Sequence, residues 1–428
     1  MQYDKIGNHL RLSQYGISIE MNTEGIGYPI YRMNEMHNML CDIDVDKYAD
    51  ISKDDYAHFA LKQGDVLFNR TNSFEWVGRT GVYYPTSNNE ERTFASYLVR
   101  FNPMQETILP EYLCAFLNSR HGVWDIKRRA RQSINQTNVN PEEVKEIDIP
   151  LLRMDIQLKI QEYFKSANVL RLQSRLAYDE ANQHLNQLLG IDNFVLTDGT
   201  ITEKKYTDFV SSTRLDAEYY QPKYDELFDK LKTFETKLLS EIVDIKKSIE
   251  PGSDAYQTSG IPFIRVADLS KFGLTNTDTY LSRDEYDGVI RPKKDTILLS
   301  KDGSVGIAYK IEEDTDVITS GAILHLIIKD DSVKPDYLTL VLNSIVVKMQ
   351  AERDAGGSVI QHWKPSEIEN VVIPILSDDI QKQITENIRE SFALRARSQQ
   401  LLELAKTAVE IAIEQGEDKA MELLTQNM

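Results

Sequence analysis

Two stretches of the sequence carry apolar residues at steps of three and four, with charged and amide residues between them. This spacing predicts two long amphipathic helices. The first begins at Asp155 and Gly190 is placed to end it, and the second begins at Asp379. Two such helices most simply pair as an antiparallel coiled coil, but neither seam is a strict heptad, so packing of each helix only on its own domain remains open. The seams consist of Ile156, Ile160, Phe164, Ala167, Leu170, Ala177, Ala181, Leu185 and Leu188, and of Ile380, Ile384, Ile388, Phe392, Leu402, Ala405, Val409 and Ile413.

Short runs of β-forming residues precede each predicted long helix. Turn residues such as Asn88-Asn89, Pro103 and Asp302-Gly303 separate these runs. A short helix over 110–119, with Pro110 near its start, lies between the strands and the first long helix. The predicted strands are 28–33, 64–68, 81–84 and 97–101 in the first half, and 261–266, 295–299 and 322–328 in the second.

The order of these motifs occurs twice in the chain. PEYLCAFLNS at 110–119 and PDYLTLVLNS at 335–344 agree at six of ten positions, 225 residues apart. Matches before and after this pair keep the same order, and their separation changes only from 233 to 224 residues. A repeat of half the chain is far longer than the 20–50 residues of solenoid units, so each copy is expected to be a domain. Retention of a duplication for packing alone is the alternative to two domains that do the same work on two targets.

We therefore expect an α+β chain with two tandem mixed α/β domains, each followed by a long helix. The predicted boundaries are 1–151 for the first domain, 152–191 for the first helix, 192–375 for the second domain and 376–428 for the second helix. The length of 428 residues agrees with more than one core.

Composition indicates an ordinary soluble protein with an acidic balance. Apolar residues make up 41% and charged residues 27%, and 67 acidic against 49 basic side chains give a net charge of −18. The N-terminus lacks the pattern of a signal peptide, no stretch is apolar enough to span a membrane, and two cysteines in this length favour a cytoplasmic protein. The acidity argues against nucleic-acid binding, although the local field at one surface matters more than the net charge.

No catalytic motif stands out in the sequence. The seven histidines show no paired metal spacing, and there is no Walker A loop, GxSxG elbow or Asn/Asp-Pro-Pro-Tyr methyltransferase motif. We therefore expect no catalytic residue, no metal site and no cofactor in this chain.

Polar and basic loops are the candidate binding residues. Arg, Asn, Gln, Ser and Thr side chains suit base edges and phosphates, and a basic run beside amide side chains suits a phosphate clamp next to base readout. An exposed hairpin loop or a solvated helix face would show the same residues, so that alternative stays open. In the first copy the candidates are Arg70, Thr71, Asn72, Ser73, Arg79, Lys127, Arg128, Arg129, Arg131, Gln132, Asn135, Gln136 and Asn138. In the second copy they are Lys301, Asp302, Ser304, Gln361, His362, Trp363 and Lys364, and the basic run is lost there.

Three segments together resemble the specificity subunit of type I restriction-modification enzymes. Gly64–Arg79 looks like part of that family's target-recognition domain, Gln132–Leu152 like its junction with a conserved helix, and Arg214–Leu227 like the start of its second half. The resemblance extends over nearly the whole chain. It implies two target-recognition domains that each read one half of a bipartite site in double-stranded DNA, joined and spaced by two antiparallel helices.

The resemblance also implies partners. Two modification subunits that carry S-adenosylmethionine would dock on the chain, restriction subunits would add cleavage, and the chain itself would not be an enzyme. A helix of about 34 residues at ~1.5 Å each spans roughly 50 Å, or about 15 base pairs as an upper limit. If the partners supply much of the phosphate contact, the acidic chain alone should bind DNA weakly.

A second class of function remains open. An acidic interaction scaffold, or an anti-restriction or phage-defence protein, would occupy methyltransferase subunits without reading DNA. The net charge of −18 favours it, and the basic run with the paired polar loops disfavours it. An enzyme with an unrecognised site is the third and least favoured class.

Overall fold

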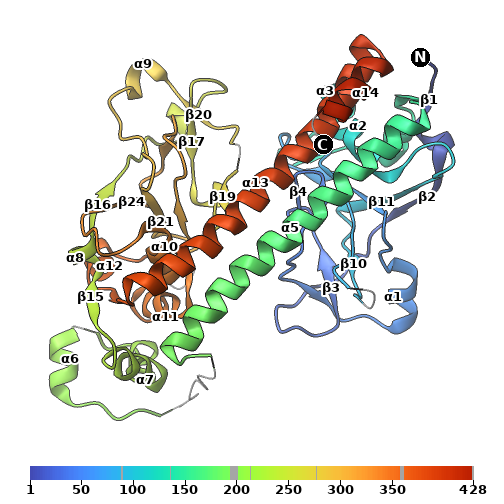
Figure 1. Cartoon of the computed structure of the whole chain (residues 1–428). Coiled ribbons are helices and arrows are strands. Elements are labelled where there is room, and N and C mark those ends of the chain that lie inside the picture. The colour runs from blue at the N-terminus through green and yellow to red at the C-terminus, as the bar shows by residue number, and fades with distance from the viewer. Residues whose placement is uncertain are drawn as a thin grey trace. The chain divides into compact units, whose positions relative to one another are not determined.

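The computed structural model describes residues 1–87, 90–134, 136–192, 201–212, 214–275, 277–356 and 361–426. The predicted turn at Asn88-Asn89 lies outside these ranges. The chain forms two compact units. Unit 1 consists of Met1–Ser174 and Ala393–Met428, and unit 2 of Arg175–Phe392. Both are mixed α/β structures, as Figure 1 shows, which confirms the expected fold class.

Unit 1 is built on a six-stranded sheet in the order β2-β11-β7-β9-β5-β4 and a three-stranded sheet in the order β10-β3-β6. Strands β1 (Tyr3–Lys5) and β14 (Asp148–Pro150) pair antiparallel. The strands of the two larger sheets are β2 (Leu10–Tyr15), β11 (Leu98–Pro103), β7 (Val66–Asn69), β9 (Thr80–Val82), β5 (Leu40–Cys41), β4 (Met36–His37), β10 (Thr93–Phe94), β3 (Tyr28–Tyr31) and β6 (Tyr48–Ala49).

Unit 2 repeats this plan with fewer strands. A four-stranded sheet has the order β16-β24-β21-β22, a three-stranded sheet the order β20-β17-β23, and β15 (Thr236–Leu238) pairs antiparallel with β25 (Val372–Pro374). The remaining strands are β16 (Val243–Lys247), β24 (Ile323–Ile328), β21 (Ile297–Ser300), β22 (Ala308–Lys310), β20 (Tyr280–Leu281), β17 (Ile261–Ile264), β23 (Ile318–Thr319), β18 (Leu269–Ser270) and β19 (Gly273–Leu274).

The sequence repeat is a repeat of topology. The order β2-β11-β7-β9 in unit 1 matches β16-β24-β21-β22 in unit 2, and β10-β3-β6 matches β23-β17-β20. In both small sheets one pair is parallel, β3 with β10 and β17 with β23, and the other is antiparallel. The two copies are therefore two domains of one kind. The predicted strands are found where expected, with ends shifted by one or two residues.

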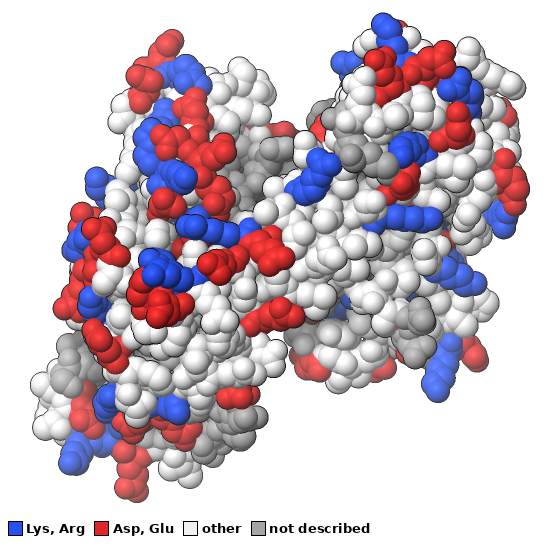
Figure 2. Space-filling view, in the orientation of Figure 1, with Lys and Arg blue, Asp and Glu red and all other residues white. Residues whose placement is uncertain are grey.

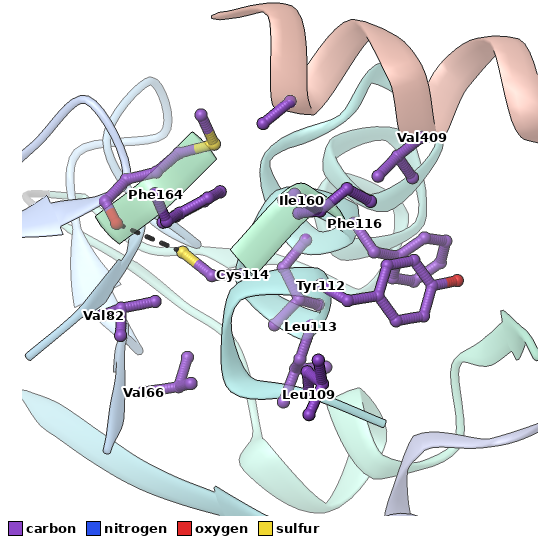
Figure 3. Close-up of a cluster of buried hydrophobic side chains, with 14 of the residues drawn as sticks. Val66, Val82, Leu109, Tyr112, Leu113, Cys114, Phe116, Ile160, Phe164 and Val409 are labelled. Carbon is purple, nitrogen blue, oxygen red and sulfur yellow. Dashed lines mark hydrogen bonds between the residues drawn. The ribbon is translucent and has the colours of Figure 1, made fainter. Parts of the chain in front are cut away.

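The repeated decapeptide forms the helices α2 (Pro110–Asn118) and α10 (Pro335–Asn343), each with proline in its first turn. Both lie in the core of their unit. The buried hydroxyl of Tyr112 donates to the carbonyl of Pro150, and that of Tyr337 donates to the carbonyl of Pro374 at 2.8 Å. Figure 3 shows Tyr112, Leu113 and Cys114 among the buried side chains of unit 1, beside Ile160 and Phe164.

Two long helices, α5 (Met154–Leu189) and α13 (Asp378–Gln415), begin close to the predicted positions, and α5 also ends where expected. The predicted second helix extends over 376–428, but α13 ends at Gln415 and the separate helix α14 (Glu417–Gln426) follows Gly416. Gly190 has φ 61° and Gly416 has φ 102°, backbone values that glycine adopts readily at a helix end. In unit 1 the hydroxyl of Ser398, late in α13, donates to the carbonyl of Ala167, early in α5, at 2.7 Å. In unit 2 the late part of α5 shares a core with the early part of α13. The antiparallel pairing is thus confirmed, and packing of each helix on its own domain alone is wrong.

Shorter helices complete the two units. Helices α3 and α11 follow α2 and α10 directly, and α4 and α12 precede β14 and β25. None of the described helices is long and apolar enough to cross a membrane. The bounds are α1 (Lys53–Phe59), α3 (Arg120–Arg129), α4 (Pro141–Lys145), α6 (Tyr206–Ser212), α7 (Pro222–Leu231), α8 (Leu239–Ile242), α9 (Arg283–Tyr286), α11 (Ile345–Asp354), α12 (Pro365–Glu369) and α14 (Glu417–Gln426), with 3-10 turns η1 (Ile6–His9), η2 (Ala217–Tyr220), η3 (Ser253–Ala255) and η4 (Val266–Asp268).

Candidate nucleic-acid interface

A small sheet in unit 1 brings the two predicted binding segments together. Strands β12 (Arg131–Gln132), β13 (Thr137–Asn138) and β8 (Thr71–Asn72) pair in this order. The sequence placed these segments about 60 residues apart, and the fold makes them neighbours. We call β8, β12, β13 and the adjoining residues Arg70 and Ser73–Arg79 the polar junction of unit 1.

Hydrogen bonds fix the backbone of this junction. Strand β7 ends at Asn69, and the Arg70 N–H then donates to the carbonyl of Tyr97 at 3.0 Å. The carbonyl of Arg70 accepts from the Val139 N–H at 2.9 Å. Between the two strands the hydroxyl of Thr71 donates to the side-chain oxygen of Asn138 at 2.6 Å. Thr71 is buried and Asn138 is half-buried, so one side chain supports the other.

Aromatic side chains hold two of the predicted arginines. The guanidinium carbon of Arg70 lies 5.2 Å from the ring centre of Tyr15, and the guanidinium of Arg79 lies over the ring of Trp76. Such contacts keep a cation in place without using all of its donors. Both arginines are half-buried, which is compatible with a ligand contact at their outer edge.

Lys127 has a structural task in this junction. Its ammonium donates to the carbonyl oxygens of Glu75 and Val77, each at 3.0 Å, and to that of Phe74. An ammonium has three donors. These contacts tie helix α3 to the loop Ser73–Arg79, so Lys127 shapes the junction more directly than it could contact a phosphate.

The rest of the basic run is partly neutralised by carboxylates. Arg128 and Arg129 both donate to Asp125, at 2.7 and 2.5 Å, and Arg131 donates to Glu143 at 2.5 Å. The side chain of Arg131 is nevertheless 73% exposed. Carboxylates therefore balance part of the positive charge of this run locally, and its role as a phosphate clamp stays a prediction.

The amide side chains lie on a β-hairpin. Gln132 and Gln136 are exposed, and the N–H of Ser133 donates to the carbonyl of Gln136 at 2.8 Å. Asn72 and Ser73 are half-buried beside this hairpin, where the side-chain oxygen of Asn72 accepts from the Ser73 N–H. Asn135 lies outside the described residues.

Unit 2 builds the same junction from Lys301–Ser304 and Gln361–Lys364. The Lys301 N–H donates to the carbonyl of Ala322 at 2.9 Å, and the carbonyl of Lys301 accepts from the Trp363 N–H at 2.8 Å. Asp302 and His362 face each other in a bridge, as Thr71 and Asn138 do. Lys301 thus stands where unit 1 has Arg70.

The side chains at the junction of unit 2 form an ionic chain. Lys301 pairs with one carboxylate oxygen of Asp302, and the other oxygen lies 2.8 Å from Nδ1 of His362. Burial raises the pKa of Asp302, but the bonds from Lys301 and His362 outweigh it and hold that pKa below its usual value. The His362 side chain is 64% exposed and therefore open to a ligand.

Four further predicted residues of unit 2 have different positions. Trp363 is 1% exposed and belongs to the hydrophobic core, so it packs against the protein and offers no surface to DNA. Ser304 is exposed, and its carbonyl accepts from the hydroxyl of Ser300 at 2.6 Å. Lys364 lies 3.4 Å from Glu367, and Gln361 is exposed beside it.

Sequence reasoning missed the aromatic partners of the arginines. Tyr15 lies at the end of β2, and Trp124 on α3 is 63% exposed with the guanidinium carbon of Arg128 4.9 Å from its ring centre. The Trp124–Arg128 spacing of four residues on a helix was a usable signal. No comparable signal marks Tyr15, because it meets Arg70 only through the fold.

Metal-binding side chains do not cluster in the described part of the chain. No group of three or more His, Cys, Asp or Glu side chains in it could hold a metal ion. Cys41 and Cys114 are buried free thiols, and burial raises the pKa of both. Figure 2 shows basic and acidic side chains interspersed over the visible face, without one large basic field.

Comparison with known proteins points to one family. Residues 231–403 match the family model of the type I restriction modification DNA specificity domain. The putative type I restriction enzyme MjaX specificity subunit of Methanocaldococcus jannaschii is 30% identical over 152 residues, which are 35% of this chain and 35% of that protein. The type I restriction enzyme EcoKI specificity subunit of Escherichia coli is 22% identical over 179 residues, 41% of this chain and 38% of that protein. The chain thus matches little more than a third of the length of these relatives.

Solved structures with similarity include the S subunit of a type I restriction-modification system from M. genitalium, 14% identical, with a TM-score of 0.39 over 99% of this chain and 95% of that one. The HsdS subunit from Thermoanaerobacter tengcongensis is also 14% identical, with a TM-score of 0.31 over 97% of each chain. Both TM-scores are low, so the fold is defined by this chain's own sheets and helices. The sequence matches confirm the predicted resemblance: residues 231–403 are similar to the DNA specificity domain of type I restriction-modification enzymes.

Proposed function

We propose that this chain is the DNA sequence-specificity subunit of a type I restriction-modification complex. In this proposal the chain is not an enzyme. It reads a bipartite site in double-stranded DNA, with one half-site for each unit. The second unit contains most of the matched specificity domain, and the first unit repeats its sheet order.

One observation carries the proposal. The same backbone junction is built twice, after β7 in unit 1 and after β21 in unit 2, and it carries different polar side chains each time. A duplication kept for packing alone would have no reason to vary polar residues at a conserved backbone. Two readers of two different half-sites require that variation, because base edges are distinguished by their donor and acceptor pattern.

Partners follow from the family. Two modification subunits that carry S-adenosylmethionine would supply the methyl transfer, and restriction subunits would add cleavage. The carboxylates that balance Arg128, Arg129 and Arg131 leave this chain few unpaired phosphate contacts in unit 1. We therefore infer that partner subunits provide much of the phosphate binding, and that the complex works in the cytoplasm.

The long helices are proposed to set the spacer between the half-sites. Helix α5 has 36 residues and α13 has 38. Removal of seven residues from each, in matched register, shortens a helix by ~10 Å, or about three base pairs. The methylated motif should then show a spacer shorter by about that number, and an unchanged spacer in an assembled complex would refute the role of the helices as a ruler.

A methylation map of the host genome with and without this gene tests the proposal. With the modification subunit expressed, loss of N6-methyladenine at one two-part motif of fixed spacer is the expected result. An unchanged map in that host would favour the acidic scaffold, which holds methyltransferase subunits without reading DNA. Methyl transfer or nuclease activity of the isolated chain would overturn its non-catalytic role.

A further inference from the structure

The two polar junctions share corresponding backbone hydrogen bonds. The N–H of Arg70 donates to the carbonyl of Tyr97, just before β11, and the N–H of Lys301 donates to that of Ala322, just before β24. The carbonyls of Arg70 and Lys301 accept from the N–H groups of Val139 and Trp363. The next residues, Thr71 and Asp302, then stand opposite Asn138 and His362. The backbone partners thus correspond in the two units, and the side chains differ.

In each pair one side chain is inner and the other is outer. Thr71 is 2% exposed and the Asp302 side chain is 22% exposed. Asn138 is half-buried, and the His362 side chain is 64% exposed. The inner residue holds the outer one by a single hydrogen bond of 2.6 Å in unit 1 and 2.8 Å in unit 2.

That bond decides which group the outer residue offers to a ligand. The hydroxyl of Thr71 donates to the amide oxygen of Asn138, so the amide nitrogen remains as a donor. A carboxylate only accepts, so Asp302 places the proton of His362 on Nδ1 and leaves Nε2 for a ligand. A neutral imidazole accepts at Nε2, whereas the amide nitrogen donates.

We propose that Asn138 and His362 are equivalent specificity-determining residues, each in contact with one base edge, and that Thr71 and Asp302 are their positioning residues. The inference rests on the proposed function and adds which atoms read the DNA. A donor at this place favours an acceptor edge such as that of guanine or thymine, and an acceptor favours the amino group of adenine or cytosine. The two half-sites should therefore differ at the base pair that this position reads.

Exchange of the pairs tests the inference. The variant Asp302→Thr with His362→Asn gives unit 2 the pair of unit 1, and Thr71→Asp with Asn138→His does the reverse. Each full-length variant is expressed with its modification subunit, and the methylation map is compared with that of the wild type. We expect the preference at one base pair of one half-site to shift roughly tenfold or more, with the other half-site and the spacer unchanged.

Unit 1 offers a matched control. His37 and Asp42 form a similar pair away from the junction, with Nδ1 2.7 Å from the carboxylate. Asp42→Thr with His37→Asn makes the same chemical change and should leave the motif as it is. If this control shifts the motif as the junction variants do, the assignment of the reading residues is wrong.

A separate series examines the positioning role. Asp302→Asn still accepts from Nδ1 and should keep the wild-type preference, whereas Asp302→Ala releases the imidazole and should broaden the preference at that same base pair. A residue that only supports the fold would lower methylation of all sites without a change in preference. His362→Ala, a surface change, serves where the double variants do not fold.

The outcomes separate the two levels of the argument. No dependence of the wild-type map on the gene would remove the proposed function itself. A normal wild-type map with an unchanged preference in every folded junction variant would overturn the inference and leave the proposed function standing. A uniform loss of methylation at all sites without a change in preference would assign these residues to the support of the fold or to phosphate contacts, and that result also overturns the inference.

Discussion

Unit 1 and unit 2 bury a carboxylate at the same place and satisfy it in different ways. The residue is Glu111 in α2 and Asp336 in α10, 2% and 1% exposed. Glu111 accepts from the hydroxyl of Tyr84 at 2.5 Å and from the amide of Gln161 at 3.0 Å. The Oδ1 of Asp336 instead lies 2.9 Å from the ammonium of Lys310, as an ion pair without the angle of a hydrogen bond. Its Oδ2 accepts a hydrogen bond from the guanidinium of Arg389 at 3.2 Å.

A second difference lies on the central strands. Arg100 of β11 and His325 of β24 occupy equal registers, opposite Leu67 and Leu298. Arg100 bonds to Asp65 at 3.1 Å and to the carbonyl of Ala60 at 2.6 Å. The imidazole of His325 is fully buried, and within the described part of the chain its Nε2 forms a hydrogen bond with the hydroxyl of Thr319 at 2.8 Å. Burial lowers the pKa of His325 to about 4.

A third difference concerns a helix face. Trp124 of α3 is 63% exposed and lines a groove of about 650 Å³ with Tyr3, Phe116 and Ile413. Its counterpart Met349 in α11 is 1% exposed, because α7 packs on α11. The same helix position is exposed in one unit and buried in the other. Together the three differences teach that the fold preserves positions and backbone bonds, while the chemistry at each position is free to change.

The largest expected effect is that of Lys310→Met. It leaves Asp336 buried with Arg389 as its remaining cation, and we expect unit 2 to lose about 3 kcal/mol of unfolding free energy. Guanidinium unfolding followed by the fluorescence of Trp363, in a chain with Trp76→Phe and Trp124→Phe, measures this unit. Adding Asp336→Leu should recover most of the loss, and a loss unchanged by that second substitution would show that the ion pair is not its cause.

Acid should weaken unit 2 through His325. The unfolded histidine takes up a proton below about pH 6.5, whereas the folded one resists until about pH 4, so the unfolded state binds more protons and stability falls as the pH falls between these values. We expect the unfolding free energy of unit 2 to fall by about 3 kcal/mol over this pH range. Unfolding of the same Trp363 reporter chain from pH 7 to pH 4 measures it.

The matched variant isolates this effect. His325→Gln should remove most of the pH dependence, and Arg100 in unit 1 stays charged throughout and adds none of this kind. An equal pH dependence in the His325→Gln chain would contradict the assignment.

Tyr112→Phe and Tyr337→Phe should have equal, smaller effects. Burial raises the pKa of both phenols, so both remain donors, and each variant leaves one proline carbonyl without its hydroxyl partner. We expect each variant to lose about 1 kcal/mol of unfolding free energy in its unit. Amide hydrogen exchange measured by mass spectrometry reports on the two units separately, and clearly unequal losses would show that the two hydroxyls are not equivalent.

The smallest effect is expected for Arg131→Ala. The arginine is 73% exposed, and its surface pair with Glu143 contributes at most about 0.5 kcal/mol. The counterpart in unit 2, which bridges to His362 as Arg131 pairs with Asn138, is Gly356. In the assembled complex the variant should reduce the slope of log affinity against log salt by about 1 or less, measured by titration of target DNA at several salt concentrations. A change in base preference would contradict a phosphate role.

Local patterns made the fold largely predictable. The periodicities at Ile156–Leu188 and Ile380–Ile413 are local, so they revealed both long helices, although the break at Gly416 between α13 and α14 was missed. The repeat revealed two copies of one domain because the order of the matching motifs can be seen in the sequence alone. Sheet order and the size of each sheet had no such signal.

The site was only partly predictable, because its contacts are not local. Thr71 and Asn138 are 67 residues apart and meet only through the pairing of β8 with β13. Trp363 has a polar neighbourhood in the sequence but an apolar one in space, so its burial could not be read from residue types. Lys127 stood in a basic run, and only the loop beneath it shows why its ammonium is engaged.

Replacement of one unit by the other tests the central claim most directly. Tyr3 pairs with Pro150, and Thr236 pairs with Pro374, so the ends of each domain lie side by side and offer matched splice points. A chain in which residues 3–150 replace 236–374 should direct methylation to a motif made of two copies of the first half-site. Retention of the original second half-site, or no new motif from a folded and assembled chain, would contradict the claim that each unit reads one half-site by itself.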